Sequence, residues 1–315
     1  MLKKVLIANR GEIAVRIVRA CAEMGIRSVA IYTEPDRYGL HVKRADESYS
    51  LGDDPLAGYL DPARIVNLAV ETGCDAIHPG YGFLSENANF ARLCEQKGVA
   101  FIGPKSSVIH GMGDKTQARD SMRAAGIPIT PGSEGNLDSL DEALELANEI
   151  GYPVMLKATS GGGGRGIRRC DTPQELKVQY PRVISEATKA FGSAEVFMEK
   201  CIVNPRHIEV QILADSQGNA IHLFERDCSI QRRNQKLIEI APSPQLTPEQ
   251  RQYIGDLAVR AAKAVGYENA GTVEFLLSGN EVHFMEMNTR VQVEHTITEA
   301  ITGVDIVREQ LRIAS

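Results

Sequence analysis

Short apolar runs alternate with helical patterns through the first hundred residues, and this alternation limits the possible fold more than any other feature. Strands are predicted at 5–8, 29–32, 75–78 and 100–102, with helical spacing of apolar residues at 13–24, 65–70 and 90–96. This order predicts an α/β domain, in which a parallel sheet carries helices on both faces. The first turn, Asn9-Arg10-Gly11, lacks the G-x-G-x-x-G of dinucleotide sites, so a sheet with a tight first turn is the preferred interpretation.

The pattern changes after Gly103-Pro104, where the regular alternation stops. A helix is expected at 116–125 and a turn-rich stretch at 128–135. Further strands are predicted at 154–158, 167–170, 195–198, 208–214 and 220–225, and a hairpin at 272–277 and 281–287. Two strands joined by a glycine-dense turn at 159–166 indicate a small α+β subdomain within this second part of the chain.

Composition and charge argue against several classes of protein. The 315 residues carry 35 Lys and Arg against 41 Asp and Glu, a formal net charge of −6, whereas nucleic-acid binding needs dense positive charge. No run of about 18 apolar residues occurs, so no membrane span is expected, and the first apolar run is too short for a signal peptide. None of the six cysteines forms a C-x-x-C pair, which predicts reduced, mostly buried thiols in a cytoplasmic protein.

The glycine-dense loop is the first feature that indicates chemistry. From Ser160 to Gly166 there is little side-chain bulk, so the backbone N–H groups can approach phosphate oxygens closely. The loop lacks G-K-[ST] and precedes a strand, so it is no P-loop. Taken alone, it could equally be a flexible surface hairpin. Lys157 on the preceding strand and Lys115 at the start of a helix favour a polyphosphate site.

Two carboxylates on the late hairpin indicate a metal site. Every second residue from Glu286 to Glu294 is polar, and period-two alternation places such residues on one face while the strand persists. Glu274 shares that face if the turn near 279–280 has an odd number of residues. Carboxylates about 4–5 Å apart repel by roughly 3–4 kcal/mol at an effective dielectric near 20, so the pair needs a cation such as Mg²⁺. An ordinary solvent-facing strand is the alternative.

The segment ERDCSIQRRNQK at 225–236 is dense in hydrogen-bond donors and lies beside apolar strands. Together with Arg290 it could form an anion pocket separate from the phosphate site. From this segment alone, a solvated loop is the preferred interpretation.

Together these segments resemble the biotin carboxylases, a family of ATP-grasp enzymes. The resemblance covers essentially the whole chain and rests on long strings in a fixed order: IANRGEIAVRIVRA at 7–20, HPGYGFLSEN at 78–87, MGDK at 112–115, LKATSGGGGRGIR at 156–168, MEKCIVNPRHIEVQILAD at 198–215, ERDCSIQRRNQK at 225–236 and FMEMNTRVQVEH at 284–295. It implies a doubly wound, Rossmann-like N-terminal domain at 1–112 and an ATP-grasp domain at 113–315. The second domain would contain a small mobile lid at 130–202 and an incomplete C-terminal subdomain at 203–315.

The resemblance also implies residue roles. ATP phosphates would be contacted by Lys115, Lys157 and the loop glycines Gly162, Gly163, Gly164 and Gly166. The adenine side would be contacted by Glu199 and by the backbone of Lys200 to Ile202, with His207 nearby, and Leu276 completes the cofactor-binding set. Mg²⁺ or Mn²⁺ would be held by Glu274, Glu286 and Asn288. The bicarbonate pocket would consist of Lys236, Arg290, Gln292 and Val293, with Glu294 as general base, and Tyr81 and Gln231 would approach biotin.

The implied reaction is MgATP-dependent carboxylation of carrier-linked biotin with bicarbonate, through carboxyphosphate. Expected partners are a biotinylated carrier protein and a carboxyltransferase subunit or domain, and acetyl-CoA, pyruvate and propionyl-CoA carboxylases all use such a module. One alternative is another ATP-grasp ligase that activates a carboxylate, such as a carbamoyl-phosphate synthetase module. The other is a nucleotide-binding module without turnover.

Two features depart from the family pattern. Asn234 stands where many members have His, and family members usually continue beyond Ser315 through the rest of the third domain. That segment supplies an arginine thought to stabilise the biotin enolate. We therefore expect a chain that binds MgATP and hydrolyses it slowly but carboxylates biotin poorly, and that is largely monomeric although full-length members are often dimeric.

Overall fold

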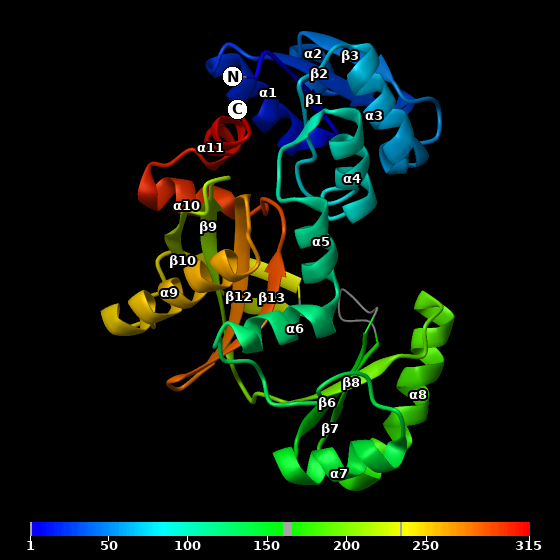
Figure 1. Ribbon diagram of the computed structural model, residues 1–315, viewed down its shortest axis with the longest axis vertical. Helices are drawn as coiled ribbons and strands as arrows, with labels where there is room; N and C mark the ends of the chain where they lie inside the picture. Colours follow the sequence, from blue (N-terminus) through cyan, green and yellow to red (C-terminus); the bar gives the residue numbers. More distant parts are fainter. Residues whose placement is uncertain (1, 160–165, 234) are drawn as a thin grey trace.

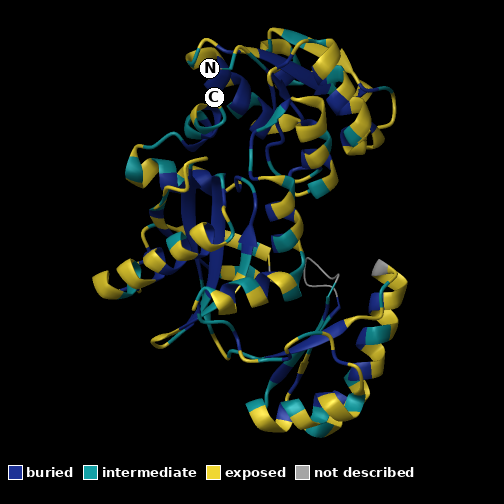
Figure 2. Ribbon diagram, viewed as in Figure 1, coloured by how far each residue is buried: buried dark blue, intermediate teal, exposed yellow. Residues whose placement is uncertain are grey.

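Three β-sheets organise the chain in the computed structural model, which describes residues 2–159, 166–233 and 235–315 (Figure 1). The first sheet lies at the N-terminal end of the chain, the second forms the centre of the molecule, and the third belongs to a small unit at the opposite end. Buried residues are concentrated on the strands of all three sheets and on the helix faces that cover them (Figure 2). None of the helices in these described ranges is long and apolar enough to cross a membrane.

All strands of the first sheet run parallel, in the order β3-β2-β1-β4-β5. Alternate residues of β1 face opposite sides, so Leu6 packs beneath α3 and α4, whereas Val5 and Ile7 pack beneath α1 and α11. The predicted doubly wound α/β sheet is therefore confirmed. The elements of this region are β1 Lys4–Ile7, α1 Gly11–Glu23, β2 Arg27–Tyr32, the 3₁₀ helix η1 Glu34–Asp36, α2 Leu40–Arg44, β3 Glu47–Ser50, the 3₁₀ helix η2 Ala57–Leu60, α3 Pro62–Glu71, β4 Ala76–His78, α4 Ala88–Lys97 and β5 Ala100–Phe101.

The small unit contains the antiparallel sheet β7-β6-β8 and helices α7 and α8. Its elements are α7 Leu140–Ile150, β6 Val154–Ala158, β7 Ile167–Cys170, α8 Pro173–Phe191 and β8 Val196–Lys200. Val154, Leu156 and Met198 from the sheet and Val183 from α8 form a core of its own. The predicted α+β subdomain is confirmed, while the loop glycines Gly162, Gly163 and Gly164 lie outside the described residues.

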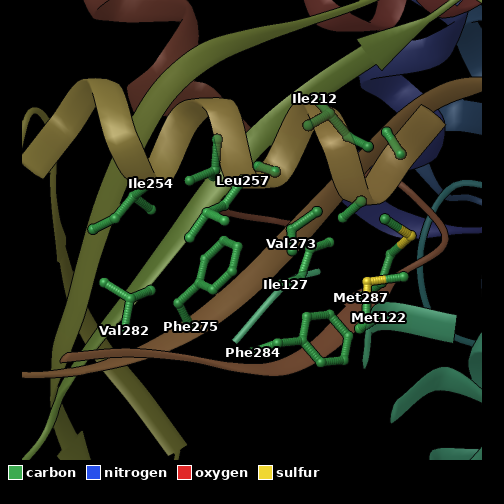
Figure 3. Packing of buried hydrophobic residues seen from close by; sticks show 14 of the residues in the cluster. Met122, Ile127, Ile212, Ile254, Leu257, Val273, Phe275, Val282, Phe284 and Met287 are labelled. Atoms are coloured by element: carbon green, nitrogen blue, oxygen red, sulfur yellow. The ribbon is translucent and has the colours of Figure 1, made fainter. Parts of the chain in front are cut away.

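The central sheet is antiparallel, in the order β11-β10-β9-β12-β13. One face packs against α6 and α9, where Phe275 and Phe284 of the sheet meet Met122 and Leu257 of the helices (Figure 3). The other face is largely polar and carries the residues described below. The elements are α5 Ser106–Gly113, α6 Lys115–Ala124, β9 Arg206–Ala214, β10 Ala220–Arg232, β11 Gln235–Ile240, α9 Pro248–Ala264, β12 Asn269–Ser278, β13 Glu281–Asn288, α10 His295–Thr302 and α11 Ile306–Ile313.

The predicted solvated loop at 225–236 is wrong. Strand β10 continues through Arg232 and pairs with β11, so most of this charged segment lies in the sheet. Its buried carboxylates tolerate burial because they have cationic partners: Glu225 binds Arg251 at 2.9 Å and Asp227 binds Arg206 at 3.1 Å. By contrast, the prediction for the cysteines is confirmed, since all six are free and five are buried.

Candidate active site on the polar face of the central sheet

Three glutamates lie in one row across three neighbouring strands. Glu209 on β9 pairs with Glu274 on β12, which in turn pairs with Glu286 on β13. The apolar residues that alternate with them fill the core on the opposite face. Like charges directly opposite one another destabilise a sheet, so this row needs cations.

A β-bulge sets the pairing between Glu274 and Glu286. The hairpin turn at 279–280 has two residues, and with regular pairing such a turn would place Glu274 opposite Met285. The register shifts by one residue beside Glu274, so Met285 is left 42% exposed and Glu286 takes its place in the row. The predicted cross-strand pair is confirmed, but the predicted odd-numbered turn is wrong.

The polar residues from 286 to 294 were predicted to lie along one strand, but they do not. Strand β13 ends at Asn288, and Glu294 is the N-cap residue of α10. Val291 is fully buried whereas Val293 is 56% exposed, so the two valines do not share one face. The chain nevertheless folds back, so that the side chains of Gln292 and Glu294 return to the row of glutamates.

Lys236 on β11 neutralises much of the row. Its Nζ donates hydrogen bonds to Glu209, to Glu274 at 2.8 Å and to Glu294 at 2.9 Å. Burial would lower the pKa of Lys236, but the charges of these three carboxylates outweigh burial and raise that pKa above its usual value. Lys236 is therefore held as a cation.

Glu274 is the most heavily bonded member of the row. Besides Lys236, its Oε1 accepts hydrogen bonds from Asn288 at 2.8 Å and Gln292 at 3.0 Å, and its Oε2 contacts His207. Burial would raise the pKa of Glu274, but the hydrogen bond from His207 and the charge of Lys236 hold it well below its usual value. Burial likewise opposes the charged form of His207, whose pKa is nevertheless raised by Glu274. Gln231 Nε2 lies 2.9 Å from the other ring nitrogen of His207.

Glu286 differs from the other two glutamates. Burial and the charge of Glu274 raise the pKa of Glu286, and Lys115 offsets this only in part. A divalent cation between the two carboxylates would relieve the repulsion, and carboxylate and amide oxygens are the donors that Mg²⁺ prefers. The residues present therefore fit the predicted metal set of Glu274, Glu286 and Asn288.

Arg226 organises the row from beneath and was not singled out by the sequence. Its side chain is fully buried, and all five of its N–H bonds have acceptors. The acceptors are Glu209, Gln211, Thr272, Gln292 and Thr298. Because Arg226 donates a hydrogen bond to the side-chain oxygen of Gln292 at 2.8 Å, the amide nitrogen of Gln292 faces Glu274.

Arg290 lies at the end of β13 and is held by the N-terminal region of the chain. Its Nε donates to Glu86 at 2.9 Å, and its two Nη atoms donate to the Val291 carbonyl at 3.2 Å and to Asn288 Oδ1 at 3.3 Å. The predicted convergence of Lys236 and Arg290 is indirect, since Asn288 links Arg290 to Glu274 and Glu274 binds Lys236.

A second group of charges lies where the small unit faces α6. Glu199 on β8 binds both Lys157 on β6 and Arg119 on α6. Burial lowers the pKa of Lys115, which also experiences the charges of Glu286, Lys157 and Glu199. Lys115 and Lys157 are thus brought together near Glu286, as expected for a site that receives a polyanion. The side chain of Lys200 donates to the carbonyl oxygens of Gly151 at 2.8 Å and Tyr152 at 3.0 Å.

The other predicted residues lie around these two groups. Gly166 directly precedes β7 with φ 71°, a value that favours glycine. Ile202 follows β8 and is half-buried, and Leu276 on β12 is paired with His207 on β9. Tyr81 lies after β4, and its carbonyl accepts a hydrogen bond from Asn9 at 2.8 Å. Asn234 lies outside the described residues.

Sequence reasoning missed three residues of this site: Arg226, Glu209 and Glu86. Glu209 had a signal, because polar His207, Glu209 and Gln211 alternate with apolar residues along a predicted strand. The sequence carries no comparable signal for Glu86, whose partner lies 204 positions away.

The chain is similar to known proteins over its whole length. Residues 1–109 match the family model "Biotin carboxylase, N-terminal domain", and residues 114–315 match "Carbamoyl-phosphate synthase L chain, ATP binding domain". The 2-oxoglutarate carboxylase small subunit of Hydrogenobacter thermophilus is 60% identical over the whole chain and 67% of its own length. Biotin carboxylase 1 of Bacillus subtilis is 57% identical over the whole chain and 71% of its own length. Pyruvate carboxylase of the same organism is 55% identical over 99% of the chain and 27% of its own length.

One solved structure bears directly on the ligands. The biotin carboxylase domain dimer of the Hydrogenobacter thermophilus 2-oxoglutarate carboxylase, in complex with MgADP, ADP and bicarbonate, superposes with a TM-score of 0.94 at 60% identity. The match covers the whole of this chain and 70% of that one.

Proposed function

Because the chain belongs to the biotin carboxylase family, ATP-dependent enzymes that carboxylate biotin, we propose that the polar face of its central sheet binds MgATP and bicarbonate and activates bicarbonate for transfer. One observation carries this proposal: Lys236 binds Glu274 of the carboxylate pair and also Glu294, and Asn288 connects this group to Arg290. Two cations therefore adjoin a metal-binding carboxylate pair and a base, the set needed to bring an anion to a nucleotide.

ATP would bind between the small unit and the central sheet. Lys115 and Lys157 would neutralise the phosphates, with Gly166 at the end of the covering loop. The adenine side would be formed by Glu199, the backbone at 200–202, and Leu276. Mg²⁺ or Mn²⁺, held by the two hairpin carboxylates and Asn288, supplies positive charge to the transferring phosphoryl group when bound.

Bicarbonate would lie between Lys236 and Arg290, oriented by Gln292 and the backbone of Val293. Burial would raise the pKa of Glu294, but the charge and hydrogen bond of Lys236 hold it below its usual value, so the carboxylate is ionised and able to accept a proton. Glu294 takes the bicarbonate proton as a bicarbonate oxygen forms a bond to the γ-phosphorus. The bond to the β–γ bridging oxygen breaks, and the products are carboxyphosphate and ADP.

Biotin would approach past Tyr81 and Gln231. Carboxyphosphate breaks down to CO₂ and phosphate, the released phosphate accepts the ureido N–H proton of biotin, and the ureido nitrogen then attacks CO₂. Water must be kept out, because it destroys the intermediates before transfer. His207, which Gln231 contacts at 2.9 Å, would connect the biotin side to the nucleotide side of the site.

The proposed macromolecular partners are a biotinylated carrier protein and a carboxyltransferase subunit or domain. The name of one relative as a carboxylase small subunit, and the presence of a matching segment within a longer pyruvate carboxylase, support a role as one component of such an assembly. The alternatives of a carbamoyl-phosphate synthetase module and a turnover-free nucleotide-binding module are not favoured, because the N-terminal match is to biotin carboxylase.

The test measures ADP release with and without bicarbonate and free biotin, together with the formation of carboxybiotin from labelled bicarbonate. Arg290→Ala should reduce stimulation by bicarbonate by at least about 100-fold while leaving MgATP affinity within about threefold, because the phosphates are held by other residues. Arg27→Ala is the matched control, since Arg27 pairs with Glu47 on the first sheet, far from the site. Loss of MgATP affinity with intact bicarbonate stimulation would contradict the assignment.

A further inference from the structure

Glu86 lies in the N-terminal region of the chain, between β4 and α4, yet its hydrogen-bond partners in the described part of the chain, Thr289 and Arg290, directly follow β13. Oε2 accepts the Nε hydrogen bond of Arg290 at 2.9 Å. Oε1 accepts from the backbone N–H of Thr289 at 3.2 Å and faces the Thr289 hydroxyl at 3.5 Å. The two carboxylate oxygens therefore have separate tasks: one holds the main chain before Arg290 and the other holds its side chain.

The hydrogen bonds of Arg290 leave a defined part of its guanidinium for a ligand. Nε is bound to Glu86, and each Nη donates once, to the Val291 carbonyl and to Asn288. A guanidinium has five N–H bonds, so among the described residues one N–H on each Nη remains without a protein acceptor. An N–H bond on each of two neighbouring Nη atoms can be donated to a planar carboxylate-like anion, which a guanidinium binds through two hydrogen bonds.

Among the residues that the structure describes, Glu86 is the one that holds the Nε side of this guanidinium. The Asn288 contact is long at 3.3 Å, and the Val291 contact is formed by the residue next to Arg290 itself. Without Glu86 the guanidinium could rotate about the bonds of the long Arg290 side chain, because that side chain is 21% exposed and not fully enclosed. Ordering a flexible arginine on binding reduces affinity for its ligand, whereas a preorganised arginine avoids that cost.

We propose that Glu86 is a positioning residue for the bicarbonate pocket: from the N-terminal domain it orients Arg290 so that the two remaining N–H bonds face the bound anion. This inference rests on the proposed function, in which Arg290 binds bicarbonate. It also gives the N-terminal domain a direct part in substrate binding.

A purely electrostatic role predicts the opposite result. A carboxylate near an anion site repels the anion, so removal of Glu86 would then strengthen bicarbonate binding. The positioning role predicts that removal weakens binding although a negative charge is lost. The sign of the change in KM for bicarbonate therefore separates the two roles.

The test measures bicarbonate-dependent ADP release in Glu86→Ala, Glu86→Gln, Arg290→Ala and the double variant Glu86→Ala/Arg290→Ala. Glu86→Ala should raise the KM for bicarbonate about tenfold, the usual effect of losing a hydrogen bond to a charged group, with KM for ATP changed less than twofold. Glu86→Gln keeps an acceptor oxygen and should recover at least half of the loss on a logarithmic scale. In the Arg290→Ala background, Glu86→Ala should have no further effect.

Glu268→Ala is the control, because Glu268 binds Lys105 at 2.6 Å on a different surface of the molecule. An unchanged or lowered KM for bicarbonate in Glu86→Ala, while Arg290→Ala is impaired, would overturn the inference and leave the proposed function intact. An additive loss in the double variant would also overturn it. If Arg290→Ala itself leaves bicarbonate stimulation unchanged, the proposed function fails, and this inference with it.

Discussion

Two substitutions of the same kind in the row of glutamates should change stability in opposite directions. Burial and the charge of Glu274 raise the pKa of Glu286, so the metal-free fold disfavours its ionised form. Glu286→Gln removes that unfavourable charge. Glu209→Gln instead removes a carboxylate that both Arg226 and Lys236 bind.

The expected magnitudes follow from the register. Side chains opposite each other on neighbouring strands lie about 5 Å apart, and two unit charges at that distance repel by roughly 3 kcal/mol at an effective dielectric of 20. Lys115 offsets part of this repulsion, so Glu286→Gln should raise the free energy of unfolding by about 1–2 kcal/mol at pH 8. Glu209→Gln breaks a buried ion pair and should lower it by about 3–5 kcal/mol.

The pH dependence has a definite sign. The folded-state pKa of Glu286 lies above its unfolded value, so folding favours its protonated form. The favourable contribution of that form is present below the unfolded pKa, about 4.3, and is lost as the pH rises through the folded pKa. The gain from Glu286→Gln should therefore be close to zero near the unfolded pKa and largest at pH 8.

The assay is urea unfolding followed by far-UV circular dichroism, because the chain has no tryptophan for fluorescence. It is run with EDTA at pH 5 and pH 8. The same Glu286→Gln variant should lose Mg-dependent ATP turnover by at least about 100-fold, because the metal loses a ligand. The reasoning is refuted if Glu286→Gln is no more stable than the wild type at pH 8, or if its gain is equal at both pH values.

Three further predictions concern other parts of the molecule. Arg226→Met should lower the free energy of unfolding by about 3–5 kcal/mol, whereas Arg169→Met, which breaks an exposed pair, should cost less than about 1 kcal/mol by the same urea assay. Phe275→Ala leaves a cavity in the core shown in Figure 3 and should lower the free energy of unfolding, measured by calorimetry, by about 3–5 kcal/mol. Its control, Ile221→Ala at a 56% exposed position, should change that free energy by less than about 0.5 kcal/mol. Lys157→Ala should weaken MgATP binding about 10- to 100-fold by titration calorimetry and leave the KM for bicarbonate nearly unchanged, and an equal loss for both substrates would contradict a phosphate-specific role.

The fold was largely predictable because it follows from periodicity. The alternation of apolar runs and helical patterns predicted the doubly wound sheet, in which Leu6 packs on one face while Val5 and Ile7 pack on the other. Periodicity failed where burial depends on ion pairing. The segment 225–236 is rich in charge and was predicted to be a solvated loop, yet Arg226 is fully buried because five acceptors from other parts of the chain surround it.

Register is the second limit on prediction from sequence. The pairing of Glu274 with Glu286 was predicted from alternation and an odd-numbered turn, but the turn is even and a bulge at Met285 restores the pairing. Nothing local in the sequence marks that bulge, since a methionine between two polar residues fits a regular strand equally well. The close approach of Glu86 to Arg290 depends in the same way on how two domains meet, which periodicity within either domain does not specify.

The row of glutamates shows why chemically identical residues have different tasks. Glu209, Glu274 and Glu286 all alternate with apolar residues on adjacent strands, so the sequence does not separate them. Glu209 is bound by Arg226 and Lys236, and this saturation suits a structural carboxylate. Glu286 lies opposite another carboxylate, and burial further disfavours its charge. A buried group that the fold alone satisfies poorly is stabilised when a ligand supplies the missing charge, so the local imbalance at Glu286, rather than its residue type, marks the place where a cation would bind.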